Sequence, residues 1–162
     1  FLRELFAKLR SRIPGLVIRT SIITGLPGEG EEEFAELCEF LREQRLERVG
    51  AFPFSPEEGT PAAEMEHPDS DVAQSRAQMV EMIQSGIMDD YNAAMIGREL
   101  EVLVDGYDEE MEQFFGRSYA DSPEIDGRVW LASEEPLTEG VFVKVMIDGC
   151  VDGELTGYVT EE

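Results

Sequence analysis

The residues best placed to do chemistry follow a buried apolar run near the start of the chain. Residues 16–24 are nearly all apolar or β-branched, and Gly25-Leu-Pro-Gly-Glu29 comes directly after them. This pattern predicts a buried parallel strand that ends in a tight turn to a helix. Ligands bind at this end of the strands in α/β sheets and barrels. Gly25 and Gly28 would let a ligand approach the backbone closely, unless they serve only the geometry of the turn.

A second predicted strand ends in the same way. Residues 48–54 have strand character, and the segment that completes them reads Phe52-Pro-Phe-Ser-Pro-Glu-Glu-Gly-Thr60. Because parallel strands end at one edge of a sheet, the two strand ends could face one pocket.

The cysteines and the histidine do not have the spacing of a metal or catalytic site. Cys38 lies on the apolar stripe of a predicted helix, which favours a small buried residue. Cys150 lies beside a glycine in a late predicted strand, and the sequence has no secretory signature that would favour a disulfide. His67, the only histidine, is in a proline-rich loop where solvent exposure is expected. We therefore expect no metal site in this sequence.

The formal net charge of −23 is the unusual feature of the composition. Residues 98–162 contain 18 acidic and 4 basic side chains, a balance of −14, while residues 1–97 contain 18 and 9, a balance of −9. A surface this acidic repels phosphate backbones, so we expect a basic protein rather than a nucleic acid as partner. The alternative is that the acidity only aids solubility. No apolar run approaches the roughly 20 residues of a membrane span, and we expect a cytoplasmic protein without membrane contact.

The hydrophobic pattern places these residues on two kinds of structure. A helix over 1–11, a strand over 16–24, a helix over 31–44 and a strand over 48–54 form a βαβ crossover, which implies a parallel sheet. A loop over 55–70 leads to a helix over 72–95, whose methionines are expected in the core rather than on a binding surface. Five short strands follow and predict a small antiparallel barrel: 99–106, 114–119, 128–131, 141–147 and 155–159.

Three segments together resemble one enzyme family. Arg-Thr-Ser-x-Ile-x-Gly-x-Pro-Gly-Glu over 19–29, followed by Phe-Ser-Pro-Glu-Glu-Gly-Thr over 54–60, is similar to the later barrel strands of the radical S-adenosylmethionine methylthiotransferases. The part after Gly97 resembles their C-terminal TRAM barrel. Gly-Arg-Ser-Tyr-Ala-Asp-Ser-Pro-Glu-Ile-Asp-Gly over 116–127 is similar to the RimO type, the branch that methylthiolates an aspartate of a small-subunit ribosomal protein.

The resemblance implies a fold and a domain organisation. The expected fold is α/β plus all-β, with the C-terminal part of a radical-SAM (β/α) barrel over 1–70 and a connecting helix over 71–96. A five-stranded antiparallel TRAM barrel, which is OB-like, is expected over 97–162. The chain starts at Phe1 within a helical pattern, and we expect it to be a fragment of a longer enzyme.

The resemblance also implies roles for individual residues. The strand over 19–25 would line the S-adenosylmethionine pocket through Arg19, Thr20, Ile23 and Gly25, with Ile23 against the adenine and Arg19 or Thr20 reaching polar groups. Phe54 and Ser55, at the next strand end, are secondary candidates for the same pocket. Four residues in the barrel would contact a basic substrate protein: Arg117, Asp121, Glu124 and Asp126. The two aspartates could equally form turns, since Asp-x-Pro and Asp-Gly are turn sequences, and Arg117 could be an internal salt-bridge partner.

The cofactor cysteines of the family are absent from the sequence. Two 4Fe–4S clusters are implied for the full-length enzyme, but the motif Cys-x3-Cys-x2-Cys does not occur here, and two cysteines cannot hold a cluster. The chain alone is therefore expected to be inactive and to contain no catalytic or metal-binding residue. Two alternatives stay open: a tRNA methylthiotransferase, which predicts a basic barrel face, and a non-catalytic protein-interaction module.

Overall fold

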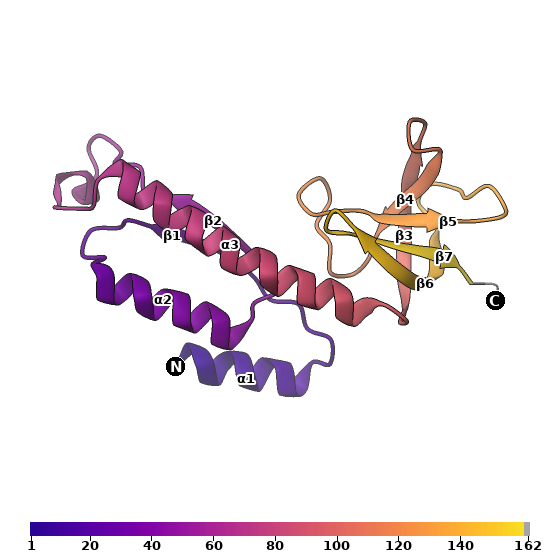
Figure 1. The fold of residues 1–162 in the computed structure, drawn as a ribbon, viewed down its shortest axis with the longest axis horizontal. Coiled ribbons are helices and arrows are strands. Elements are labelled where there is room, and N and C mark those ends of the chain that lie inside the picture. Colours follow the sequence, from indigo (N-terminus) through magenta and orange to yellow (C-terminus); the bar gives the residue numbers. More distant parts are fainter. Residues whose placement is uncertain (161–162) are drawn as a thin grey trace. The chain divides into compact units, whose positions relative to one another are not determined.

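Two parallel strands lie at the centre of the first half of the chain in the computed structural model, which describes residues 1–160 (Figure 1). The elements of this half are α1 (Leu2–Arg12), β1 (Arg19–Thr24), α2 (Glu31–Gln44), β2 (Arg48–Pro53), a 3-10 helix η1 (Pro61–Glu64) and α3 (Ser70–Met95). The predicted order of helices and strands is confirmed. Residues Phe1–Met88 form one compact unit, and a second begins at Asp89, so α3 belongs to both.

The helices of the first unit cover one face of the β1–β2 sheet. Leu41 on α2, Leu46 just after it and Val80 on α3 are almost fully buried. They pack against Ile22 of β1 and Val49 of β2. The described residues contain only these two parallel strands in this sheet. An α/β barrel needs about eight strands to close. The radical-SAM barrel, of which residues 1–70 were expected to be the C-terminal part, is therefore not present in this chain.

Helix α2 begins and ends where its sequence dictates. Gly30 precedes it, and the backbone N–H of Gly30 donates to the carboxylate of Glu33 at 2.9 Å. Acidic side chains in the first turn interact favourably with the helix dipole. At the other end Arg45 has a left-handed backbone with a φ of 46°, which stops the helix just before β2.

The second unit contains a closed five-stranded barrel. Its strands are β3 (Glu99–Asp108), β4 (Gln113–Arg117), β5 (Val129–Ala132), β6 (Phe142–Val151) and β7 (Glu154–Val159). The order around the barrel is β3-β4-β5-β7-β6, and pairing of β3 with β6 closes the ring.

The prediction of an antiparallel barrel was wrong in one pair, because β5 and β7 run parallel. The other four pairs are antiparallel. In a closed ring of five strands, directions cannot alternate all the way round, so at least one neighbouring pair must be parallel. Here the pair is formed because β7 returns by a hairpin from β6 and fills the gap beside β5.

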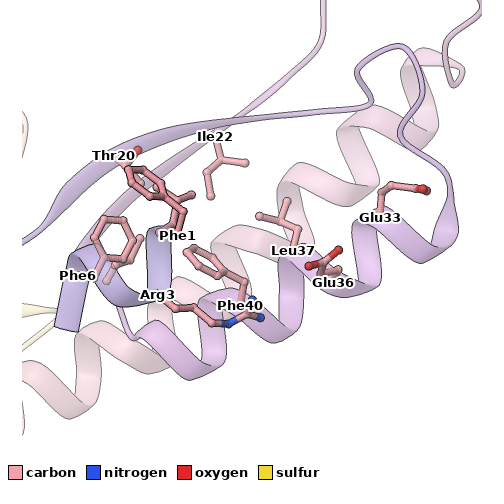
Figure 2. Close-up of a pocket in the computed structure, with 11 residues that line it drawn as sticks. Phe1, Arg3, Phe6, Thr20, Ile22, Glu33, Glu36, Leu37 and Phe40 are labelled. Carbon is pink, nitrogen blue, oxygen red and sulfur yellow. The ribbon is translucent and has the colours of Figure 1, made fainter. Parts of the chain in front are cut away.

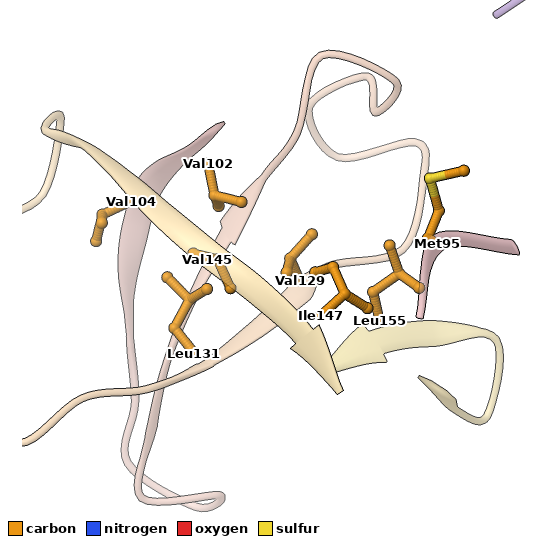
Figure 3. Packing of buried hydrophobic residues seen from close by; sticks show 8 residues of the cluster. All are labelled: Met95, Val102, Val104, Val129, Leu131, Val145, Ile147 and Leu155. Carbon is orange, nitrogen blue, oxygen red and sulfur yellow. The ribbon is translucent and has the colours of Figure 1, made fainter. Parts of the chain in front are cut away.

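The fully buried side chains of the barrel core are apolar and come from every strand except β4, together with the end of α3; Phe114 of β4 packs against them while partly exposed. Figure 3 shows the buried cluster: Met95, Val102, Val104, Val129, Leu131, Val145, Ile147 and Leu155. Strand β4 contributes Gly116 instead, where a Cβ atom would lie 2.2 Å from the Leu103 carbonyl oxygen. The glycine therefore permits the close approach of β4 to β3.

Candidate functional site

The ends of β1 and β2 lie side by side, as the sequence indicated. Thr24 pairs with Pro53 in the parallel register, and the Phe54 backbone N–H donates to the Thr24 carbonyl oxygen at 2.8 Å. The loops that follow the two strands therefore start from the same edge of the sheet. This edge is the part of an α/β sheet where ligands bind.

The predicted residues on β1 are divided between the two faces of the sheet. Arg19 and Ile23 lie on the face that the helices leave open, and Ile23 is 49% exposed. On β2, Phe52 stands opposite Ile23 and is 54% exposed. Thr20 points to the helix-covered face, because side chains alternate along a strand. A ligand on the open face would thus meet Arg19, Ile23 and Phe52.

Thr20 lines a cavity of about 680 Å³ on the helix side (Figure 2). Its walls are mainly apolar and come from α1, β1 and α2, with Phe6, Ile22 and Phe40 among them. The Phe6 and Phe40 rings are 6.1 Å apart. Glu33 and Glu36 lie toward one end of the group in Figure 2. Neither Arg19 nor Ile23 lines this cavity.

Gly25 is buried against α3. Its φ is +78°, and a Cβ atom there would lie 2.4 Å from the Cβ of Ala73. The Thr24 hydroxyl donates to the Ala73 carbonyl oxygen at 2.9 Å. The space beside Gly25 is therefore filled by α3, which supports the turn-geometry interpretation of this glycine rather than close approach of a ligand.

The turn after Gly25 is held by a buried ion pair that the sequence analysis missed. Arg76 of α3 donates to the Glu29 carboxylate at 2.8 Å and to the Glu29 carbonyl oxygen at 2.9 Å. Another nitrogen of its guanidinium donates to Glu31 at 2.7 Å. The Glu29 carboxylate also accepts the Gly25 N–H at 2.9 Å. Arg76 is only 6% exposed, so the contact fixes the loop to α3.

Phe54 and Ser55 begin the loop after β2. The Phe54 ring meets the His67 ring edge to face at a centroid distance of 5.3 Å. His67 is half-buried, and its Nδ1 lies 2.9 Å from the Pro68 carbonyl oxygen. The exposed position expected for His67 is therefore replaced by packing against Phe54. Ser55 itself is exposed.

Three of the four candidate docking residues of the barrel, Asp121, Glu124 and Asp126, lie on the connection between β4 and β5, and Arg117 is the last residue of β4. The Asp121 carboxylate accepts the Ser118 hydroxyl at 2.6 Å and the Ser118 N–H at 3.0 Å. The Asp126 carboxylate accepts the Ser122 N–H at 2.6 Å. Both aspartates thus form turns within the connection. Glu124 is exposed, with a φ of 61°.

Arg117, Glu124 and Asp126 line a polar cavity of about 550 Å³ beside the barrel, whereas Asp121 is not in its wall. Arg117 is paired with Asp105. Arg128 lies over the Phe115 ring at 4.1 Å and donates to Asp108 at 3.1 Å.

Glu154 closes another side of the polar cavity. It accepts the Trp130 indole N–H at 2.6 Å and the Arg128 backbone N–H at 2.9 Å. The sequence offered no signal for this contact, because Glu154 lies more than twenty positions from both donors.

The pKa values of Asp108 and Cys38 are displaced from their ordinary values. The Met111 N–H, the Glu110 N–H and Arg128 stabilise the charged form of Asp108 and lower its pKa. Burial raises the pKa of the Cys38 thiol, which keeps that cysteine protonated and unreactive at neutral pH. Over residues 1–160, no group of three or more histidine, cysteine or carboxylate side chains is arranged to hold a metal ion. None of the helices described is both long and apolar enough to cross a membrane.

Comparison with known proteins gives the same family that the motifs indicated. Residues 96–159 match the TRAM domain family. A ribosomal protein uS12 methylthiotransferase RimO from Anaeromyxobacter sp. (strain Fw109-5) is 46% identical over 161 residues, covering 98% of the chain. Proteins of the same name from Desulforamulus reducens and Clostridium botulinum (strain Hall) are 44% and 40% identical, again over 98% of the chain.

The chain spans about a third of the length of these curated relatives, 34% to 36%. It matches their C-terminal part. The resemblance inferred from the residues is therefore confirmed over nearly the whole chain.

Proposed function

Because residues 96–159 are a TRAM domain and the whole chain is similar to the C-terminal third of RimO proteins, we propose that it works as that part of a ribosomal-protein methylthiotransferase. The observation that carries the proposal is the 46% identity over 98% of the chain. By analogy with the names of the relatives, the proposed substrate is ribosomal protein uS12. The motif resemblance implies that the modified residue is an aspartate. A ribosomal substrate also implies a cytoplasmic enzyme.

The open face of β1 and β2 is proposed to contribute to an S-adenosylmethionine site. The residues present fit this ligand, because Ile23 and Phe52 offer exposed apolar surface for an adenine and Arg19 lies on the same face of β1. Phe54 and Ser55 stand at the strand ends and are secondary candidates. Gly25 would act by holding the turn in place, whereas Thr20 lies on the other face of β1. When bound, S-adenosylmethionine supplies the methyl group and, on reductive cleavage, a radical that abstracts hydrogen.

The iron–sulfur clusters of the family do not fit the residues of this chain. Cys38 is buried in the first unit and Cys150 is exposed in the second. A cluster needs several thiolates that converge on it. We propose that the clusters are bound by cysteines outside these 162 residues, and that the chain alone does not catalyse turnover.

The acidic barrel is proposed to dock a basic ribosomal protein. With 18 acidic and 4 basic residues over 98–162, it attracts cationic partners and repels phosphate. Among the four candidate contacts, Glu124 is exposed, whereas Asp121 and Asp126 accept hydrogen bonds within their loop and Arg117 is paired with Asp105.

The alternative with a nucleic-acid substrate, a tRNA methylthiotransferase, is disfavoured by this charge. A TRAM barrel that binds tRNA should present arginine and lysine to phosphates. Of the four basic side chains in residues 98–162, Arg117 and Arg128 are already paired with aspartates of the barrel.

The test is to titrate the chain with purified uS12 and, separately, with tRNA at several salt concentrations. We expect binding to uS12 that weakens as salt rises, because attraction between exposed charges is screened, and no binding to tRNA. Salt-dependent binding to tRNA alone would move the protein to the other branch. Binding to neither would refute the proposed docking role of the barrel, and the proposed enzyme family would then be supported only by sequence similarity.

A further inference from the structure

The connection between β4 and β5 is longer than its geometry requires. The two strands are antiparallel neighbours, with Gly116 opposite Val129. Two residues are enough to join such strands in a tight hairpin. Here residues 118–128 intervene, and their ends lie close together because the strands pair there. Compact surface loops of this kind frequently carry function.

The loop is held by its own hydrogen bonds. The Ser118 side chain is clamped to Asp121, and its hydroxyl also accepts the Ala120 N–H at 3.2 Å. The Asp126 N–H donates to the Ser122 carbonyl oxygen at 3.2 Å, while the Asp126 carboxylate binds the Ser122 N–H. Ala120 of the loop is buried. The two aspartates therefore fix the loop in one shape, and their carboxylates are engaged with it.

The side chains that the loop presents to solvent are different. Tyr119 is 64% exposed and Ile125 is 75% exposed, and Glu124 between the two turns is exposed as well. We call Tyr119, Glu124 and Ile125 the loop patch. Aromatic and aliphatic side chains on a loop that is already ordered lose little conformational freedom on binding. Such residues commonly dominate the binding energy of an interface, while charges set the encounter rate.

We propose that the loop patch recognises the protein substrate, with Tyr119 and Ile125 as apolar anchors. This inference rests on the proposed function and names the part of the barrel that makes the contact. The occupant is a basic protein segment with apolar side chains of its own, because the barrel around the loop carries a balance of −14. The acidity attracts the partner over a distance, and the two anchors hold it.

The experiment compares two matched double variants of the chain in titrations with uS12 across a salt series. Tyr119→Ala with Ile125→Ser should weaken binding by about tenfold or more at every salt concentration, with an unchanged salt dependence. Tyr158→Ala with Val151→Ser is the control, because these side chains are 48% and 61% exposed in the same barrel but lie on β7 and β6. The control should bind like the original chain. Glu124→Gln should reduce the salt dependence and leave high-salt binding nearly unchanged.

Trp130 fluorescence verifies that each variant retains the folded barrel. Equal losses of uS12 affinity in the two double variants would overturn the proposal, because non-specific contact by any exposed apolar side chain would then explain the binding. Full binding by the loop variant would overturn it as well and leave the proposed function standing. If the original chain does not bind uS12, both the proposed docking role of the barrel and this inference are refuted.

Discussion

At the scale of single residues, Glu154 of the barrel accepts hydrogen bonds from two donors. Its carboxylate accepts the indole N–H of Trp130 on β5 and the backbone N–H of Arg128, the residue before β5. It lies at the start of β7, the strand that pairs parallel with β5. One carboxylate thus helps to fix the only parallel pair in the ring.

We expect Glu154→Ala to lower the free energy of unfolding of the barrel by about 1–3 kcal/mol, because two donors lose a charged acceptor. Glu154→Gln keeps one acceptor oxygen and should lose less. Trp130 is the only tryptophan of the chain, so its fluorescence in a urea titration reports on the barrel directly.

Glu139→Ala is the matched control, since Glu139 is exposed in the loop before β6. Surface substitutions away from such contacts usually change stability by less than about 0.5 kcal/mol. If the alanine variants at 154 and 139 unfolded at the same urea concentration, the stabilising role of Glu154 would be refuted.

At the scale of elements, α3 fixes the end of β1 through contacts far apart in the sequence. Ala73 packs on Gly25, and Arg76 binds Glu29 and Glu31 at the start of α2. The loop at the proposed ligand end of the sheet is therefore held by the first turns of α3.

Replacing Arg76 by alanine should destabilise the first unit by about 3 kcal/mol, because the Glu29 carboxylate, with its side chain 12% exposed, would lose its cationic partner. Lysine keeps the charge but not the fork that reaches both glutamates, and we expect an intermediate loss. Unfolding followed by far-ultraviolet circular dichroism measures the effect on the helices.

Arg3→Ala is the comparison for this prediction. Arg3 pairs with Glu43 at a similar distance of 2.8 Å, but the two side chains are 49% and 46% exposed. Exposed pairs contribute little to stability, because water screens the two charges. Similar losses for the alanine variants at 76 and 3 would show that burial of the Arg76 pair adds no stability.

An element could be predicted from the sequence where the residues that determine it lie within the element or next to it. Helix α2 was predicted with its observed bounds, because its glutamates, apolar stripe and flanking turn all lie within it. A closed ring of five strands requires a parallel pair, but strand patterns could not show that β5 and β7 form it, since pairing depends on how the ring closes.

For the candidate site, motif reasoning located the strand ends and the β4–β5 loop. It could not show that Asp121 turns into its own loop while Tyr119 is left exposed. It also could not link Arg76 to Glu29, because no periodicity connects a residue on one helix to the turn before another.

At the scale of the whole chain, the two units differ in whether the edges of their strands are paired. The barrel is closed, so each of its strands has two neighbours. In the part of the chain that the structure describes, β1 and β2 pair only with each other, and Ile23 and Phe52 are half exposed on the open face. Unpaired edges and exposed apolar faces reduce stability and favour association.

We therefore expect hydrogen exchange to be slower in β3–β7 than in β1 and β2 of the isolated chain. Amides exchange through local opening, and opening is easiest where few neighbours must separate. Mass spectrometry of exchanged peptides at two protein concentrations measures this. If protection of β1 and β2 rises with concentration, copies of the chain pair along these strands. Equal protection of both units in a monomer would contradict the expectation, because the two-stranded sheet would then be stable without covering its open face.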